Sequence, residues 1–231
     1  LQRHNIPFES ASAKGANMKM FQHIKWRAVN ATKQLAEERG ECPDGVGYGV
    51  RNAHLLAVAP NASSSIICGN TSPSIEPYRA NAFTQKTKSG SSLLKNEYLE
   101  HALQELDQDT DEVWKSIITN NGSVQHLDFL DDWTKDVFKT AVEIDQRWII
   151  EMAADRQKEI CQSQSLNVFF PANVSKQELH AIHMMAWKKK VKTLYYLRSE
   201  AIKRAETVSD EALRQYIFDS IDDDGCLACE G

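Results

Sequence analysis

Two short, mainly apolar runs most constrain what this chain can fold into. They are Leu55–Ala59 and Leu166–Phe170, and prolines close them at Pro60 and Pro171. Apolar runs of this length that end at proline are typical of buried strands. Because most of the remaining sequence has a helical pattern, we predict one helix-rich α/β unit with few, widely separated strands.

The helical pattern appears in six segments that contain good helix formers or apolar residues at helical spacing. A capping box, Ser175 to Glu178, opens the last of them, and tryptophans 133 and 148 are expected in the core. The predicted helices are Met18–Glu38, Asn96–Leu106, Glu112–Asn120, His126–Phe138, Val142–Gln164 and Ser175–Lys190, and further strand candidates are Phe83–Lys88 and Lys192–Tyr196.

Charge and composition exclude several classes of protein. The chain has 231 residues and a formal net charge of -5, which argues against broad nucleic-acid binding. No apolar run approaches the roughly 20 residues that span a bilayer, and the first residues do not resemble a signal peptide. The five cysteines are an odd number and thinly spread, so we expect a cytoplasmic protein without a disulfide framework.

The end of the sequence carries two thiols at C-x-x-C spacing, Cys226 and Cys229, directly after an acidic stretch, 222–225. Beyond Glu206 the sequence is polar and acidic, so we predict a folded part, 1–206, and a flexible tail, 207–231. A dithiol on such a tail suits electron transfer between a buried site and an external reductant. The alternative is half of a zinc site, for which the chain offers no second cysteine pair.

A serine-rich loop follows the first predicted strand and consists of Pro60, Asn61, Ala62, Ser63, Ser64 and Ser65. Its hydroxyls and exposed backbone N–H groups can surround an anion, especially if a helix begins there. The loop contains no lysine and is therefore not a Walker P-loop. Spacing alone favours a simple serine-rich turn and helix cap.

Adjacent tyrosines, Tyr195 and Tyr196, lie in the last strand candidate. Such a pair usually provides one core ring and one half-exposed ring. The functional alternative is a pair of stacked phenols that pass an electron and a proton, and sequence spacing does not separate the two. His180 and His183 lie one helical turn apart without a suitable third ligand, so we predict no metal site in this chain.

Several of these signals occur in an order that resembles a known family. Together they resemble the C-terminal third of the large (α) subunit of class I ribonucleoside-diphosphate reductase and cover nearly the whole chain. The segments that carry the resemblance are Gly49–Ile66, Ser74–Pro77, Gln162–Asn167, Lys192–Tyr196 and the terminal cysteine pair.

The resemblance implies a fold, a reaction and roles for particular residues. The fold is a ten-stranded α/β barrel around a finger loop, of which this chain would be the helix-rich C-terminal half. The reaction replaces the ribose 2′-hydroxyl of a ribonucleoside diphosphate by hydrogen, through a cysteine radical, and yields deoxyribonucleotides. The loop 60–65 would hold the substrate diphosphate, although the family often has an acidic residue where Ala62 stands.

The same resemblance assigns the two redox pairs. Tyr195 and Tyr196 would relay the radical from the small subunit, which carries a di-iron tyrosyl radical. Cys226 and Cys229 would reduce the active-site disulfide and then be reduced by thioredoxin or glutaredoxin. This chain itself would bind no cofactor.

The family motif Asn-x-Cys-x-Glu and the cysteines of the active site do not occur in this sequence. We therefore expect a fragment, or one product of a split large subunit, that needs a complementary N-terminal polypeptide. An incomplete barrel would expose strand edges and apolar surface, which favours obligate association. Two alternatives remain open: a thiol-disulfide or zinc-binding interaction module, and an inactive remnant of a reductase.

Overall fold

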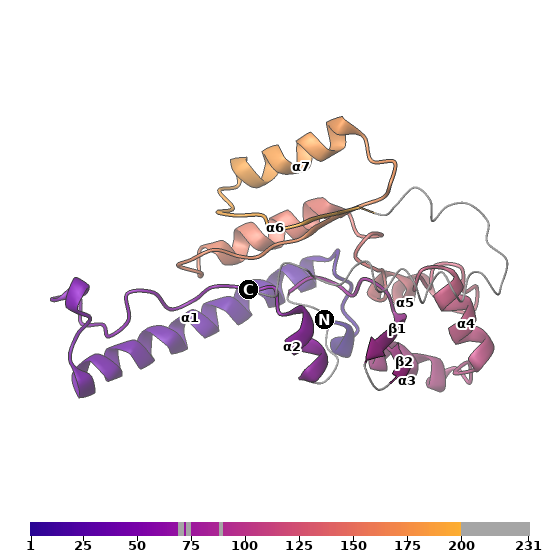
Figure 1. Ribbon diagram of the computed structural model, residues 1–231, viewed down its shortest axis with the longest axis horizontal. Coiled ribbons are helices and arrows are strands. Elements are labelled where there is room, and N and C mark those ends of the chain that lie inside the picture. The colour runs from indigo at the N-terminus through magenta and orange to yellow at the C-terminus, as the bar shows by residue number, and fades with distance from the viewer. Residues whose placement is uncertain (69–71, 73–74, 88–89, 200–231) are drawn as a thin grey trace.

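The computed structural model of the protein describes residues 1–68, 72, 75–87 and 90–199 (Figure 1). The predicted tail, 207–231, with Cys226 and Cys229, lies outside the described residues. The helices are α1 (Ala11–Arg39), α2 (Ala62–Ile67), α3 (Glu97–Glu105), α4 (Asp111–Thr119), α5 (Asp132–Val137), α6 (Gln146–Gln157) and α7 (Lys176–Lys188). The strands are β1 (Ala82–Thr87), β2 (Gly90–Lys95), β3 (Val168–Phe170) and β4 (Leu197–Ser199).

Helix capping explains where the observed helices differ from the predicted ones. Helix α1 begins at Ala11 rather than Met18, because the Ser10 side chain accepts a hydrogen bond from the Ala13 N–H. The prediction of a helix from His126 was wrong for the residues before Asp132. Successive turns occupy that stretch, and the Asp131 side chain caps α5 by accepting from the Thr134 N–H.

Strand pairing confirms the α/β class. Strand β1 is shifted by one residue from the predicted Phe83–Lys88 and forms an antiparallel hairpin with β2, which the sequence analysis missed. Strand β3 lies within the predicted Leu166–Phe170 and pairs in parallel with β4. The predicted strand Leu55–Ala59 makes only an isolated parallel bridge, from Val58 to Gln164. Within the described residues these strands form two-stranded sheets and no closed barrel.

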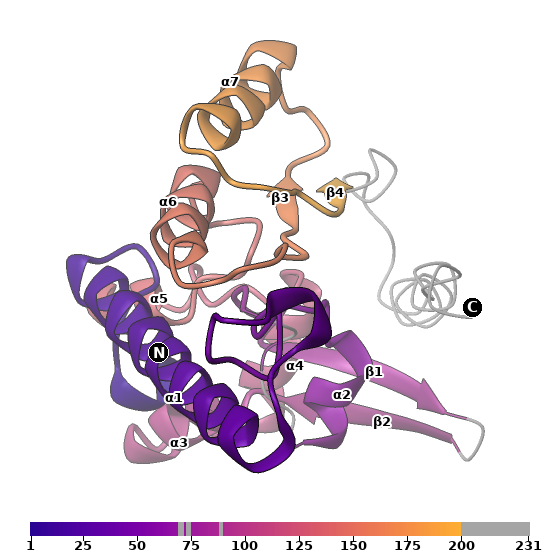
Figure 2. The ribbon, with the colours of Figure 1, turned by 90° about the vertical axis from the view of Figure 1, so that its left-hand side faces the viewer.

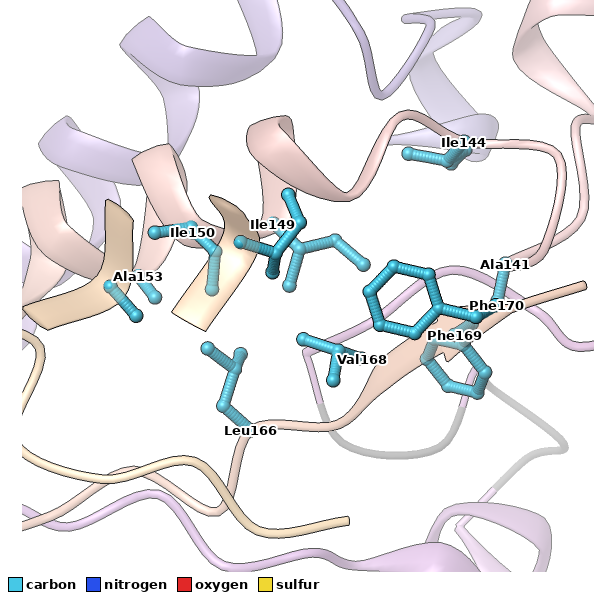
Figure 3. Packing of buried hydrophobic residues seen from close by; sticks show 11 residues of the cluster. Ala141, Ile144, Ile149, Ile150, Ala153, Leu166, Val168, Phe169 and Phe170 are labelled. Atoms are coloured by element: carbon cyan, nitrogen blue, oxygen red, sulfur yellow. The ribbon is translucent and has the colours of Figure 1, made fainter. Parts of the chain in front are cut away.

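Two separate hydrophobic clusters hold the described part of the chain. One lies where α6 and α7 cover β3 (Figures 2 and 3) and includes Ile149, Ile150, Leu166, Val168 and Phe170. The other joins β1 to α3, α4 and α5 and includes Leu99, Leu103, Trp114, Ile117 and Phe138. Neither cluster contains a residue of the long helix α1, which extends to one side of the molecule (Figure 1).

Tryptophan burial differs from the prediction. Trp133 is 53% exposed and donates from its indole N–H to the Asn5 carbonyl, while Trp148 is half-buried. The expectation that both rings are core residues was therefore wrong. No helix in the part of the chain that the structure describes has the length and apolar character needed to cross a bilayer.

Gly122 provides a test of the close packing beside β1. It has a φ of +78°, and a Cβ there would lie 2.6 Å from the Ala80 Cα and 2.9 Å from the Asn81 nitrogen. We predict that Gly122→Ala lowers the free energy of unfolding by about 2–4 kcal/mol, because backbone strain and the clash add. Urea unfolding monitored by circular dichroism measures the change.

Gly15 is the matched control, because it lies inside α1 with nothing within 4 Å of the position of a Cβ. Gly15→Ala should raise the free energy of unfolding by about 0.5–1 kcal/mol through helix propensity. Equal stability of the two variants would contradict the packing at Gly122.

Candidate functional site

Three parallel segments lie side by side and bring the serine-rich loop and the tyrosine pair into one region. Val58 bonds to both neighbours of Gln164, since its N–H donates to Ser163 (3.1 Å) and its carbonyl accepts from Ser165 (2.8 Å). On the other side, the Thr193 hydroxyl donates to the Gln164 carbonyl at 2.7 Å. Segments 55–59, 162–170 and 192–199 therefore follow one another in that order, and their carboxyl ends share one edge.

The serine-rich loop follows the first of these segments and the tyrosines lie on the third. Neighbouring strands are about 4.8 Å apart, so the end of the first segment is roughly two strand spacings from the tyrosine pair. The chain thus brings together two predicted elements that are far apart in sequence.

Tyr195 and Tyr196 are in direct ring contact. Their ring centroids are 4.2 Å apart and the planes are inclined by 58°. Tyr195 is 45% exposed and Tyr196 is half-buried, so neither ring is part of a hydrophobic cluster. The common arrangement of one core ring and one half-exposed ring is not found here.

A slip in the hydrogen-bond register accounts for this contact. In a regular parallel ladder continued from the Val168–Leu197 pair, the Tyr196 N–H would donate to the Leu166 carbonyl. Instead the Tyr195 N–H does so at 2.7 Å, while the Tyr196 carbonyl accepts from Val168 at 3.0 Å. The third segment therefore contains one extra residue, as in a β-bulge. Regular strands send adjacent side chains to opposite faces, and the bulge removes that constraint.

A cation covers the second ring. The Arg198 guanidinium carbon lies 4.6 Å from the centroid of Tyr196, which is within cation–π range. Residues two apart on an extended segment share a face, so Tyr196 and Arg198 of β4 lie on the same side of the third segment. The sequence analysis missed Arg198, although its two-residue spacing from a candidate redox tyrosine was a usable signal.

Glu76 is a buried carboxylate close to this region. It is 4% exposed and accepts hydrogen bonds from the Asn167 N–H at 2.7 Å and from the Asn167 Nδ2 at 3.2 Å. Burial raises the pKa of Glu76, while the Asn167 bonds and the positive charges of Arg156 and Arg198 act in the opposite direction. Both Glu76 and Asn167 belong to segments that carried the family resemblance, but no role was predicted for either.

The serine-rich loop is largely helical. Asn61 has a left-handed conformation (φ 48°, ψ 28°) and precedes α2, so Ala62 to Ser65 form the first turn of that helix. Ser64 is exposed and Ser65 is buried. A helix start agrees with the helix-cap interpretation, although the Asn61 side chain makes no capping hydrogen bond. The start of a helix also presents its first backbone N–H groups toward its N-terminal end, which is the arrangement that an anion site requires. Diphosphate binding by residues 60–65 stays a prediction.

Metal-ligating side chains do not gather in the described ranges, where no three His, Cys, Asp or Glu residues could hold an ion together. His180 and His183 are both exposed on α7, and a ring nitrogen of His183 pairs with the Leu179 carbonyl.

Burial alone would raise the pKa of the Cys161 thiol, but hydrogen bonds from the Leu56 and Leu55 N–H groups bring this pKa below its usual value.

Comparison with known proteins agrees with this arrangement. The sequence model of the family described as "Ribonucleotide reductase, barrel domain" matches residues 43–197. The chain is 50% identical over 213 residues to the ribonucleoside-diphosphate reductase large subunit of Invertebrate iridescent virus 6, covering 90% of this chain and 22% of that protein. It is 44% identical over 234 residues to the large subunit of Invertebrate iridescent virus 3, covering 100% of this chain and 37% of that protein.

A solved structure is also similar. The Actinobacillus ureae class Id ribonucleotide reductase alpha subunit superimposes with a TM-score of 0.81 at 40% identity, over 87% of this chain and 37% of that one. The chain thus spans well under half the length of these relatives. Since the barrel-domain match covers residues 43–197, most of the sequence, this chain belongs to the ribonucleotide reductase barrel-domain family.

Proposed function

We propose that this chain is the C-terminal part of a class I ribonucleoside-diphosphate reductase large subunit and serves in the reduction of ribonucleoside diphosphates to deoxyribonucleotides. The observation that carries the proposal is the ring contact of Tyr195 with Tyr196, at 4.2 Å, on a parallel ladder of a reductase-family domain. A tyrosine pair in contact outside the core is suited to passing a radical. We place the reaction in the cytoplasm, where thiol reductants are maintained.

The three parallel segments are proposed to be part of a ten-stranded barrel that the rest of the large subunit completes. Residues 1–206 would form the C-terminal portion of that domain and residues 207–231 its redox tail. Large apolar side chains on the described surface support this, since an incomplete domain leaves such groups uncovered. They include Met20 (53% exposed), Trp26 (56%), Tyr48 (80%), Ile67 (84%) and Trp187 (73%). The complementary part can belong to the same polypeptide or to a second one.

In the proposed relay, a radical on one tyrosine takes an electron and the phenolic proton from the other. The first ring is restored to a neutral phenol and the second becomes the radical, so charge and atoms balance. The di-iron tyrosyl radical of a separate small subunit would supply the initial oxidising equivalent. The contribution of this chain is to keep the two phenols in contact.

The loop 60–65 is proposed to hold the substrate diphosphate, through the N–H groups at the start of α2 and the exposed hydroxyl of Ser64. Cys226 and Cys229 are proposed to re-reduce the active-site disulfide and then to be reduced by thioredoxin or glutaredoxin. The spacing of the two thiols supports this second assignment.

The relay is tested by Tyr195→Phe and Tyr196→Phe in the chain assembled with the remaining large-subunit part and the small subunit. Phenylalanine has no phenolic proton to give up with the electron, so we expect loss of deoxyribonucleotide formation to background in each variant. The control is Tyr98→Phe, at a half-buried tyrosine outside the ladder. Full activity of either variant would contradict the radical-relay assignment.

The redox tail is tested by the double change Cys226→Ser and Cys229→Ser. We expect multiple turnover with thioredoxin or glutaredoxin to be lost, while a small dithiol still supports turnover because it reaches the disulfide directly. Product formed per enzyme with each reductant is the measurement, and Cys42→Ser is the control. Unchanged turnover with the protein reductant would contradict the tail assignment.

The diphosphate site is tested by Ser64→Ala, which removes an exposed hydroxyl from the first turn of α2. Loss of one hydrogen bond to a charged group should raise the KM for the ribonucleoside diphosphate by about tenfold, with less effect on kcat. Ser163→Ala, at an exposed serine on the neighbouring segment, is the control. Equal KM values for the two variants would count against this loop as the phosphate site.

A further inference from the structure

Arg198 is a charged residue next to the tyrosine pair to which the proposed function assigns no role. It is half-buried on β4, opposite Phe169 of β3, and its guanidinium lies over the Tyr196 ring at 4.6 Å from the centroid. Among the cations that cover aromatic rings in the described residues, Arg198 alone lies on a ring of the candidate relay.

The register slip at the tyrosine pair changes which groups can hold the Tyr196 ring. A tyrosine in a regular strand is held by its neighbours on the same face, but the register slips by one residue between Tyr195 and Tyr196. Tyr195 contacts the Tyr196 ring and is itself 45% exposed. The guanidinium covers a face of Tyr196, and a planar cation on a π-face restricts the orientation of the ring.

The position of Arg198 is itself supported by the neighbouring strand. Its backbone is fixed by the parallel pairing of β4 with β3. The Glu76 carboxylate, anchored to Asn167 by two hydrogen bonds, interacts electrostatically with the Arg198 charge. The attraction of the buried Glu76 carboxylate therefore helps to keep the Arg198 guanidinium close to the ladder.

We propose that Arg198 is a positioning residue that holds the Tyr196 ring against Tyr195 for radical transfer. This inference rests on the proposed relay function. Arg198 exchanges no electron or proton itself: the electron and the phenolic proton pass together between the two tyrosines. Its contribution is the ring geometry, on which the rate of that transfer depends.

The test uses Arg198→Met and Arg198→Gln in the complex assembled from the full chain, the remaining large-subunit part and the small subunit. We expect kcat to fall by about tenfold or more, the factor for roughly 1.4 kcal/mol of lost transition-state stabilisation, with KM for the ribonucleoside diphosphate unchanged within about twofold. Arg198→Lys, which keeps the charge without the planar fork, should recover part of the lost kcat.

A spectroscopic measurement separates positioning from a general loss of stability. With 3-fluorotyrosine at position 196, the ¹⁹F resonance should shift and broaden in Arg198→Met as the ring becomes less restricted. The matched control is Arg27→Met, because Arg27 also covers an exposed aromatic ring, that of Trp26, at 5.7 Å. This control should change neither the ¹⁹F resonance nor kcat.

The outcomes distinguish this inference from the proposed function. If Tyr196→Phe is inactive while Arg198→Met and Arg198→Gln keep wild-type kcat and an unchanged ¹⁹F resonance, the positioning role is wrong and the relay stands. If Tyr196→Phe is fully active, the relay itself is wrong. A fall in kcat equal to that of Arg27→Met, or a rise in KM alone, would also overturn the positioning role.

Discussion

The described fold depends on one buried glutamine. Gln164 is fully buried, its amide donates to Ala153 and Gln157 of α6, and its Oε1 accepts from the Arg156 guanidinium at 2.6 Å. Its backbone joins the other two parallel segments, through the bridge to Val58 and the bond from Thr193. A buried amide must satisfy its hydrogen bonds, so this residue determines how the ladder packs on α6.

The same network reaches the long helix α1. The Arg156 guanidinium also donates to the Asn17 side chain, and the Asn17 amide donates to the Met152 carbonyl of α6. Burial lowers the pKa of Arg156 to about 10, so the group stays charged at neutral pH and requires these acceptors. Polar contacts thus attach a helix that the hydrophobic clusters leave largely uncovered.

The ladder brings residues that are far apart in sequence into one region of the fold. Parallel segments place their carboxyl ends at one edge, and loops at that edge converge. In this chain the serine-rich loop follows one segment and the tyrosine pair interrupts another.

The sequence by itself determined the helix-rich α/β class and the family. It also located the two apolar runs, one of which contains β3 and the other the bridging residue Val58. Ordered motifs and apolar runs that end at proline are local signals, so they can be recognised without the tertiary structure. It did not determine that β2 pairs with β1, that Trp133 is exposed, or that residues 126–131 form turns, since these depend on contacts with distant residues. The sequence showed that two tyrosines are adjacent, but it did not show how their rings lie. Tertiary structure decided that the rings are in contact and that neither is a core ring, because the register slip against Leu166 and Val168 and the cation at Arg198 exist only when the segments are paired.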